Sequence, residues 1–257
     1  MKLTARLEKI SSLVDPGKKI ADIGTDHAYI PSYLMSKGLV SEAILTDVNK
    51  GPLDNAKSEI SKLGFEDRCQ LRLGNGLEVV KPGEVDQIII AGMGGILISE
   101  ILEAGRSTAI AAEKLILQPM QAQEELRQYL DRSGYEIESE HLVREDFRIY
   151  EILVVRYRGL DYQTSSYRDF YLGFKEEDHS QINQKDMEKI ILDLSYEIPK
   201  LIFNNPKDLV EGFIDRKLHE YSSILDKMPN IDNETINKRK KEINFKLSVI
   251  KALKKKI

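Results

Sequence analysis

The chain has 257 residues, of which 41% are hydrophobic and 31% charged, and its formal net charge at pH 7 is −4. This composition predicts a soluble protein with a hydrophobic core, and the acidic balance argues against a simple polyelectrolyte binder of nucleic acid. The sequence contains no apolar run near the ~20 residues of a membrane span, and its amphipathic N-terminus does not resemble a signal peptide. The single cysteine, Cys69, cannot form an internal disulfide. We therefore expect a cytoplasmic protein with no membrane association.

Apolar runs and helical patterns alternate along the first 158 residues. An amphipathic helix around Leu3–Val14 is stopped by Asp15-Pro16-Gly17. Strands are then expected at Lys19–Ile23, Ala43–Val48, Cys69–Leu73, Asp86–Ala91 and Lys114–Leu117. Helices are expected at His27–Ser36, Pro52–Leu63, Ile96–Glu103 and Ala122–Ser133. Two more strands, Tyr135–Val143 and Tyr150–Arg158, are joined by the polar turn Arg144–Arg148.

This alternation predicts an α/β protein with a parallel sheet covered by helices on both faces. The terminal hairpin implies that the last strand runs antiparallel to the others. Seven strands with such an end are typical of methyltransferases that use S-adenosylmethionine (SAM), whereas a nicotinamide-binding sheet usually has six parallel strands. The periodicity alone leaves both classes open.

The character of the sequence changes after Gly159, which predicts two domains, 1–159 and 160–257. Asp161–Arg168 is polar and rich in tyrosine and is a candidate linker. Two amphipathic stretches separated by Pro229-Asn230 predict an antiparallel helical hairpin. Lys238–Lys256 holds nine Lys/Arg against one acid, Glu242. Such a basic stripe can bind phosphates, although a solvated helix end has the same composition.

Ile20–Pro31, which reads IADIGTDHAYIP, predicts a buried strand, a glycine turn and a helix N-terminus. A glycine turn lets the backbone approach a ligand, and the first amides of a helix are free donors, so this arrangement is typical of nucleotide sites. One glycine is a weaker signal than a full G-x-G-x-x-G, and an ordinary strand–turn–helix fits the same pattern.

Three more strand ends carry small or polar residues. Asp47 lies about twenty residues beyond the glycine turn, where an acid can accept both hydroxyls of a ribose. Asn75-Gly76 could read an adenine edge, and the glycines of Ala91–Gly95 allow close backbone approach. Each alone also fits a simple turn. Together on the carboxyl edge of a parallel sheet they favour a ligand site.

Other kinds of site find little support. The sequence has neither a P-loop nor a G-x-S-x-G nucleophile elbow. The histidines are scattered and the lone cysteine does not join them, so we expect no zinc or other metal site. Their positions are His27, His141, His179 and His219.

Several motifs resemble the bacterial TrmK family, the tRNA (adenine-22-N1)-methyltransferases. They are ADIGTDHAYIP at Ala21–Pro31, LTDV at Leu45–Val48, GNGL at Gly74–Leu77, AGMGG at Ala91–Gly95 and LQP at Leu117–Pro119. The similarity extends over Leu3–Arg158 and includes Arg6-Leu7 and Tyr150–Leu153. The resemblance implies a Rossmann-like, seven-stranded SAM-dependent methyltransferase domain followed by a smaller all-α, coiled-coil-like domain that is a candidate for tRNA binding.

The resemblance also implies roles for individual residues. Asp22, Gly24 and His27 would line the methionine part of SAM, and Asp47 would hold the ribose. Asn75 and Gly76 would face the adenine, with Val48 packing on its ring. Ala91, Gly92 and Met93 would pass beneath the sulfonium. Asp26 and Tyr29 would face the target adenosine.

The expected reaction is an in-line attack of adenine N1 on the SAM methyl group, with tRNA as the partner. Asp26 could stabilise the positive charge that develops on the base, and Tyr29 could stack on it. An N-cap of the following helix is the structural alternative for Asp26. Three other functions remain open at this point: a SAM enzyme with another acceptor, an NAD-dependent oxidoreductase, and a catalytically silent RNA-binding module.

Overall fold

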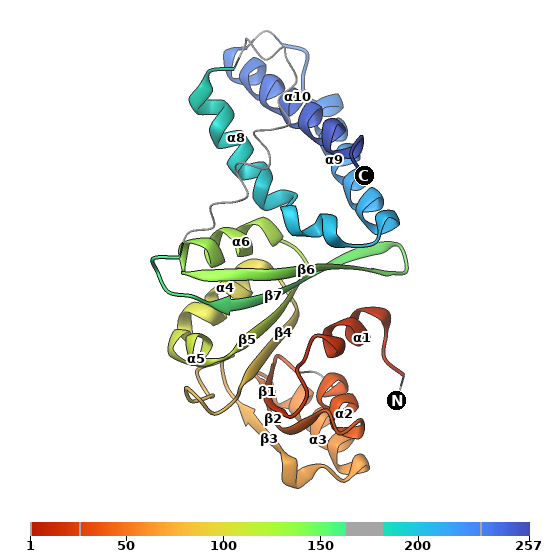
Figure 1. Cartoon of the computed structure of the whole chain (residues 1–257), viewed down its shortest axis with the longest axis vertical. Helices are drawn as coiled ribbons and strands as arrows, with labels where there is room; N and C mark the ends of the chain where they lie inside the picture. Colours follow the sequence, from red (N-terminus) through yellow and green to blue (C-terminus); the bar gives the residue numbers. More distant parts are fainter. Residues whose placement is uncertain (1, 26, 163–181, 232) are drawn as a thin grey trace. The chain divides into compact units, whose positions relative to one another are not determined.

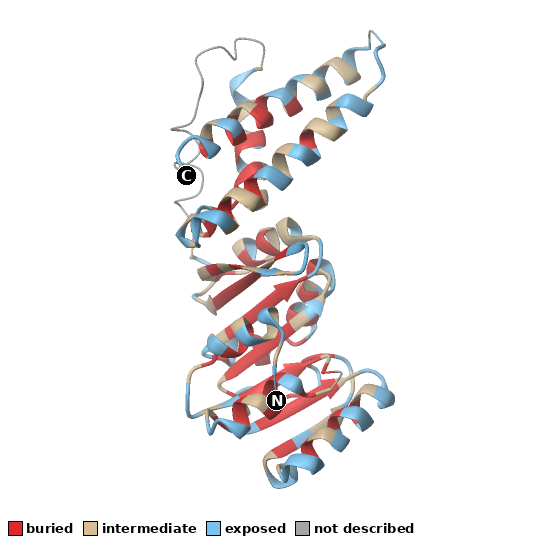
Figure 2. Cartoon of the chain, turned by 90° about the vertical axis from the view of Figure 1, so that its right-hand side faces the viewer, coloured by how far each residue is buried: buried red, intermediate tan, exposed pale blue. Residues whose placement is uncertain are grey.

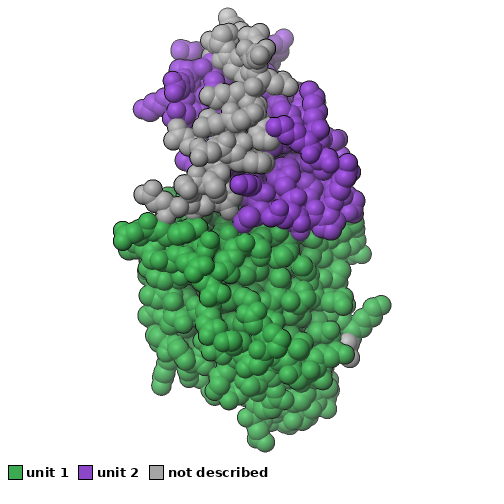
Figure 3. Space-filling view, viewed as in Figure 1, with its two compact units in different colours: residues 1–163 green, residues 164–257 purple. Residues whose placement is uncertain are grey.

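In the computed structural model, the described residues are 2–25, 27–162, 182–231 and 233–257. The chain divides into two compact units, Met1–Gln163 and Thr164–Ile257, which Figure 3 colours separately. Each unit is described by itself below. Most of the candidate linker Asp161–Arg168, like Asp26 and His179, lies outside the described residues.

The first unit contains a seven-stranded sheet with the order β3-β2-β1-β4-β5-β7-β6 (Figure 1). Its strands are β1 (Lys18–Ile23), β2 (Val40–Asp47), β3 (Cys69–Leu73), β4 (Gln87–Met93), β5 (Lys114–Pro119), β6 (Tyr135–Glu145) and β7 (Arg148–Tyr157). The strands β1 to β5 pair in parallel, and β7 pairs antiparallel with both β5 and β6. The expected Rossmann-like sheet with a terminal hairpin is confirmed.

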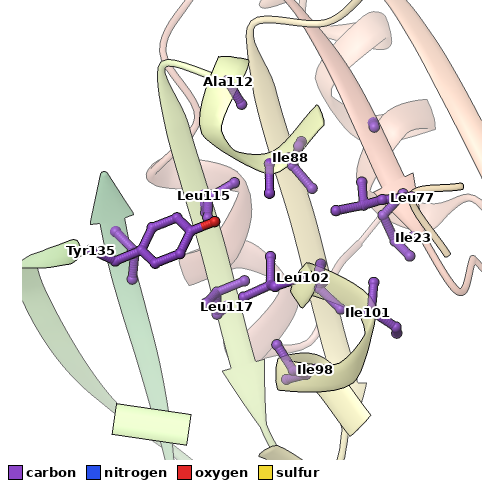
Figure 4. Close-up of a cluster of buried hydrophobic side chains, with 14 of the residues drawn as sticks. Ile23, Leu77, Ile88, Ile98, Ile101, Leu102, Ala112, Leu115, Leu117 and Tyr135 are labelled. Carbon is purple, nitrogen blue, oxygen red and sulfur yellow. The ribbon is translucent and has the colours of Figure 1, made fainter. Parts of the chain in front are cut away.

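Helices cover both faces of this sheet, because the strands carry apolar residues on both sides. The helical elements of this unit are α1 (Ala5–Ser12), α2 (Tyr29–Ser36), α3 (Lys50–Leu63), η1 (Glu66–Arg68), α4 (Gly95–Ala104), α5 (Arg106–Ala111) and α6 (Gln123–Arg132). One buried cluster joins Ile23 and Ile88 to Leu102 on α4 (Figure 4). A second joins Ile20 to Ile10 on α1 and Leu34 on α2. In Figure 2 the strands between these layers are mostly buried.

Three boundaries differ from the sequence predictions. Helix α2 begins at Tyr29 rather than His27, because Ala28 takes a left-handed φ of 52° and occupies the N-cap position. Strand β5 continues to Pro119, which pairs with Met93 at the end of β4. The expected polar turn Arg144–Arg148 shrinks to a two-residue loop, since Glu145 pairs with Arg148 in the hairpin.

The second unit contains three long helices and a 3-10 turn among its described residues. They are α8 (Gln184–Glu197), η2 (Lys200–Asn204), α9 (Lys207–Lys227) and α10 (Glu234–Lys254). The contacts Asp215–Lys254 and Tyr221–Lys246 show that α9 and α10 run antiparallel, as the sequence predicts. Lys246 is buried and donates to Glu197 on α8 at 2.5 Å, which joins all three helices. Within the described part of the chain, no helix is both long and apolar enough to span a membrane.

A buried ionic triad holds the hairpin to α6 in the first unit. Arg127 donates from Nε to Glu140 at 2.7 Å and from Nη2 to Glu151 at 2.6 Å. All three side chains are almost fully buried. Burial raises the pKa of the Glu140 carboxyl, so the guanidinium is what stabilises negative charge at this position.

We expect Arg127→Ala to lower the free energy of unfolding by roughly 3–5 kcal/mol, because it leaves two buried carboxylates without a cation. Arg132→Ala on the same helix removes an exposed arginine whose only hydrogen-bond partner among the described residues is Gln128, and should change stability by less than about 0.5 kcal/mol. Denaturant titrations of both variants measure the difference. Equal midpoints would contradict a structural role for the triad.

Candidate active site

The loop after β1 is tied to the end of β2. The backbone N–H groups of Gly24 and Thr25 both donate to the Thr46 carbonyl, at 2.8 and 3.1 Å. Gly24 has a φ of 73°, and a Cβ added there would lie 1.9 Å from the Met93 methyl group. Glycine therefore satisfies two local demands at once, the left-handed turn and the close packing on β4.

A cavity of about 350 Å³ lies against this loop at the carboxyl edge of the sheet. It brings together six of the residues that the sequence assigns to the site: Asp22, Gly24, His27, Tyr29, Ala91 and Gly92. The remaining lining residues are Thr4, Arg6, Leu7, Thr25, Ala28 and Ile30. A Cβ added to Gly92, whose φ is 80°, would meet no atom within 4 Å, so this glycine leaves space at the cavity wall.

Asp22 is the buried acid of this cavity. It is the second-last residue of β1, flanked by Leu45 on β2 and Ile89 on β4, and is only 8% exposed. Burial raises the pKa of its carboxyl to about 6, and the nearby Thr25 hydroxyl offsets the shift only in part. A buried carboxylate of this kind is poised to receive a cationic group of a ligand.

Arg6 brings a positive charge to the same cavity from α1. Its Nη1 donates to the Gln118 side-chain oxygen at 2.6 Å, and the same oxygen accepts from the Gly92 N–H at 3.2 Å. Gln118 is fully buried and donates in turn to the Pro119 carbonyl at 2.9 Å. One amide side chain thus fixes both the guanidinium and the glycine backbone at the edge of β4.

His27 and Tyr29 form an aromatic pair at the cavity. Their ring centroids lie 5.1 Å apart and the rings are nearly parallel, with an interplanar angle of 10°. Tyr29 is 45% exposed although it begins a helix beside the core. A partly exposed aromatic stack at a ligand cavity offers a flat surface on which another ring can pack.

The other predicted residues lie along the same edge, outside the cavity lining. Asp47 ends β2, and its carbonyl accepts from Gly74 N–H at 3.0 Å directly after β3. Its Oδ1 accepts from Asn49 N–H at 2.7 Å. The Gly76 carbonyl accepts from the buried Thr46 hydroxyl at 3.3 Å. Asn75 is exposed, as is Val48, so this part of the edge is open to solvent.

A larger hollow, of about 620 Å³, lies in the second unit near the starts of α8 and α10. Its polar lining includes Asp186 and Lys238, which pair with each other at 3.0 Å. It contains no strand end and none of the predicted site residues. The chemistry of the first cavity makes it the better candidate, despite its smaller volume. Among the described residues, no group of three or more His, Cys, Asp or Glu side chains could hold a metal ion.

Comparison with known proteins identifies the family to which this domain belongs. Residues 3–153 match the family model for a methyltransferase domain. The crystal structure of the B. subtilis m1A22 tRNA methyltransferase TrmK superposes with a TM-score of 0.74 at 30% identity, covering 98% of this chain and 99% of that one. The chain belongs to the TrmK family of methyltransferases.

Two further matches extend this comparison. The tRNA (adenine(22)-N(1))-methyltransferase of Bacillus subtilis is 42% identical over 154 residues, which are 60% of this chain and 65% of that protein. This alignment therefore spans slightly less than two thirds of that relative. TrmK of M. capricolum, solved with S-adenosyl-homocysteine, has a TM-score of 0.70 and 26% identity, covering 97% of this chain and 100% of that one.

The sequence predictions missed Arg6 and Gln118 as members of the site. Both lie within the segments that resemble the TrmK family, Arg6-Leu7 and Leu117–Pro119. Neither follows the glycine turn or a polar strand end, so no local pattern singled them out. Met93 packs its methyl group at Gly24 and does not line the cavity.

We expect Asp22→Asn to stabilise the protein at pH 7 by up to about 3 kcal/mol. The carboxyl has a pKa of about 6 in the fold, against 3.8 for an unperturbed aspartate, so the native state binds the proton more tightly. Below about pH 4 the carboxyl is protonated in both states and does not lower the free energy of unfolding. As the pH rises towards 6, ionisation of Asp22 lowers that free energy. Asparagine cannot ionise, so the variant avoids this decrease. The gain should therefore be present at pH 7 and absent near pH 4.

Denaturant titrations at both pH values measure this difference. Asp54→Asn, at an exposed position on α3, is the matched control and should change stability by less than about 0.5 kcal/mol at either pH. An equal effect of Asp22→Asn at pH 4 and pH 7 would show that this carboxyl ionises normally in the folded protein.

Proposed function

We propose that this protein is a cytoplasmic, SAM-dependent tRNA methyltransferase that transfers a methyl group to N1 of adenine-22. The observation that carries the proposal is the cavity at the carboxyl edge of the sheet, where Asp22 and Arg6 lie with the glycine backbone of β4. Among the TrmK relatives are a tRNA methyltransferase and a structure with the cofactor product S-adenosyl-homocysteine, which supports tRNA as the substrate and SAM as the cofactor.

The residues of the cavity fit the amino-acid end of SAM. That end carries an α-ammonium and an α-carboxylate, and the cavity holds one buried carboxylate, Asp22, and one guanidinium, Arg6. Opposite charges at short range in a partly buried site favour such a zwitterion. The space beside Gly92 leaves room for the ligand to pass along β4.

The nucleoside end would follow the neighbouring strands. Asp47 would accept hydroxyl groups of the ribose, since one of its carboxylate oxygens is engaged by Asn49 and the other has no hydrogen bond among the described residues. Asn75 and Gly76 would face the adenine, and the exposed Val48 would pack on its ring. Met93 would pack its methyl group against Gly24 and so support the turn after β1.

The chain's main catalytic task is positioning and electrostatics. When bound, SAM supplies an electrophilic methyl group on a sulfonium. Adenine N1 attacks with its own lone pair, so no base must remove a proton beforehand. Tyr29, supported by the ring of His27, would stack on the target adenine. Asp26 would stabilise the positive charge on the methylated base and later accept a proton.

The helical unit would bind the body of the tRNA. Helix α10 carries Lys240, Lys241 and Lys251, none of which has an ion-pair partner among the described residues. Unpaired lysines attract phosphates and release counterions on binding. Lys246 serves a different purpose, because it is buried against Glu197 and Tyr221.

Incubation with labelled SAM and total bacterial tRNA should transfer label to tRNA, and nucleoside analysis should find 1-methyladenosine. Replacing adenine-22 in a transcribed tRNA should abolish the transfer. Calorimetry should detect SAM binding and no NAD(H) binding. Label on another acceptor, or tRNA binding without transfer, would contradict the proposal.

The same assay tests the role of Asp26. Asp26→Asn should lower kcat and leave SAM affinity unchanged, since the carboxylate is expected to act only on the target base. The helix N-cap is Ala28, so loss of a helix cap does not account for such an effect. Methylation at full rate by this variant would remove the catalytic role.

Replacing Lys240, Lys241 and Lys251 together by alanine should weaken tRNA binding and leave SAM binding unchanged. If each lysine contacts a phosphate, the slope of log K against log salt should decrease by about two to three. Lys57, Lys62 and Lys81 of the first unit are exposed and provide the matched triple control. Equal salt slopes for the two triple variants would assign tRNA binding to another surface.

A further inference from the structure

The β6–β7 hairpin extends well beyond the sheet on the side of the candidate active site. The last pair that joins it to β5 is Leu153–Leu117. Pairing within the hairpin continues through residues 152 to 148 of β7, as far as Arg148–Glu145. At about 3.4 Å per residue, this arm is roughly 17 Å long, and its inner part is packed, since Ile152 lies in the buried cluster with Ile10 of α1. Figure 1 shows it reaching past the end of β5, on the side where α1 lies.

The tip of the arm displays an aromatic ring between two arginines. Phe147 is 85% exposed, the largest exposed fraction among the large hydrophobic residues that the structure describes. Arg148 lies with its Cζ 5.5 Å from the centre of that ring. Arg144 is exposed, and neither arginine has a carboxylate partner among the described residues.

The tip also contains two acidic residues, Asp146 and Glu145, and each has a structural role. Asp146 takes a left-handed φ of 53°, which the two-residue loop requires. Glu145 turns back towards α1, where its Oε2 accepts from the Arg6 N–H at 2.9 Å. The charge of Glu145 is therefore directed away from the tip.

The contacts of Arg6 place this tip at the rim of the cavity. Arg6 lines the cavity and lies with its Cζ 5.4 Å from the ring of Tyr150 on β7. Phe147 belongs to the two-residue loop directly beyond the Glu145–Arg148 pair, so it lies at the very end of the hairpin. Both belong to the first unit, so this arrangement is internal to the catalytic domain.

We propose that the hairpin tip, Arg144–Arg148, contacts the tRNA next to the target adenosine, with Phe147 stacked on an adjacent base and Arg144 and Arg148 on the flanking phosphates. This inference rests on the proposed function. A target base inside a folded tRNA must leave its stack to reach the cavity, and its neighbour then loses a stacking partner. Aromatic and arginine side chains together are the usual contacts for unstacked RNA.

Phe147→Ala should lower kcat/KM for tRNA by about tenfold, the effect expected for the loss of one base–aromatic stack, with SAM affinity unchanged. Phe147→Tyr should retain most of the activity because it keeps the ring. Leu63→Ala, which removes an exposed apolar side chain at the end of α3, is the matched control and should have no effect.

A fluorescent 2-aminopurine placed at position 22 of the tRNA reports directly on unstacking. Wild-type protein should raise its fluorescence, and Phe147→Ala should reduce that rise. Arg144→Ala and Arg148→Ala should each lower the salt slope of tRNA binding by about one, while Arg132→Ala should leave it unchanged. Asp146→Gly keeps the turn and removes a negative charge, so it should not weaken binding.

Two results would overturn the inference and leave the proposed function intact. One is methylation of tRNA by Phe147→Ala at the rate of Leu63→Ala. The other is a change in self-association of Phe147→Ala with no change in kcat/KM, which would make the tip a protein contact. Absence of methyl transfer by the wild-type protein would instead overturn the proposed function itself.

Discussion

The candidate active site depends on the parallel pairing of β1 with both of its neighbours. Because β1 pairs with β2 on one side and β4 on the other, all three end on the same edge of the sheet. The loop after β1 is then fixed by two hydrogen bonds to the Thr46 carbonyl and by the packing of Met93 on Gly24. This pairing holds Asp22 in the sheet, where burial raises the pKa of its carboxyl.

Charges at this edge are arranged in a few defined contacts. Asp22 is buried, and Arg6 is held by Gln118, which also orders the Gly92 backbone. A buried amide suits this role because its oxygen can accept two hydrogen bonds while its nitrogen donates to the chain. Helix α1 therefore contributes to the site as well as to the core. The cavity presents both signs of charge, which a zwitterionic ligand requires.

The terminal hairpin contributes both to the stability of the first unit and to its exposed surface. Its inner half is joined to α6 by Arg127, Glu140 and Glu151 and to β5 by ladder pairing. Further out, Leu142, Ile149 and Ile152 are buried, and the tip carries the exposed Phe147. A hairpin that is anchored by α1 and α6 and exposed at its tip is a suitable arrangement for presenting a side chain to a large substrate. In the second unit, Lys246 similarly joins three helices and leaves other lysines of α10 exposed.

The sequence by itself determined the α/β class, the order of the strands along the chain and the antiparallel hairpins at the end of each unit. It could do so because apolar periodicity and glycine turns are local signals. It also singled out Asp22, Gly24 and Gly92 at strand ends and glycine turns, the resemblance to TrmK added Tyr29, and the structure brings these four residues to one cavity. Only the tertiary structure decided that Arg6 reaches the cavity, that Gln118 joins it to Gly92, and that Arg144–Arg148 forms the end of an arm rather than a wide turn. The contact of Arg6 with Gln118 joins residues 112 positions apart, and such pairings arise from packing rather than from any local pattern.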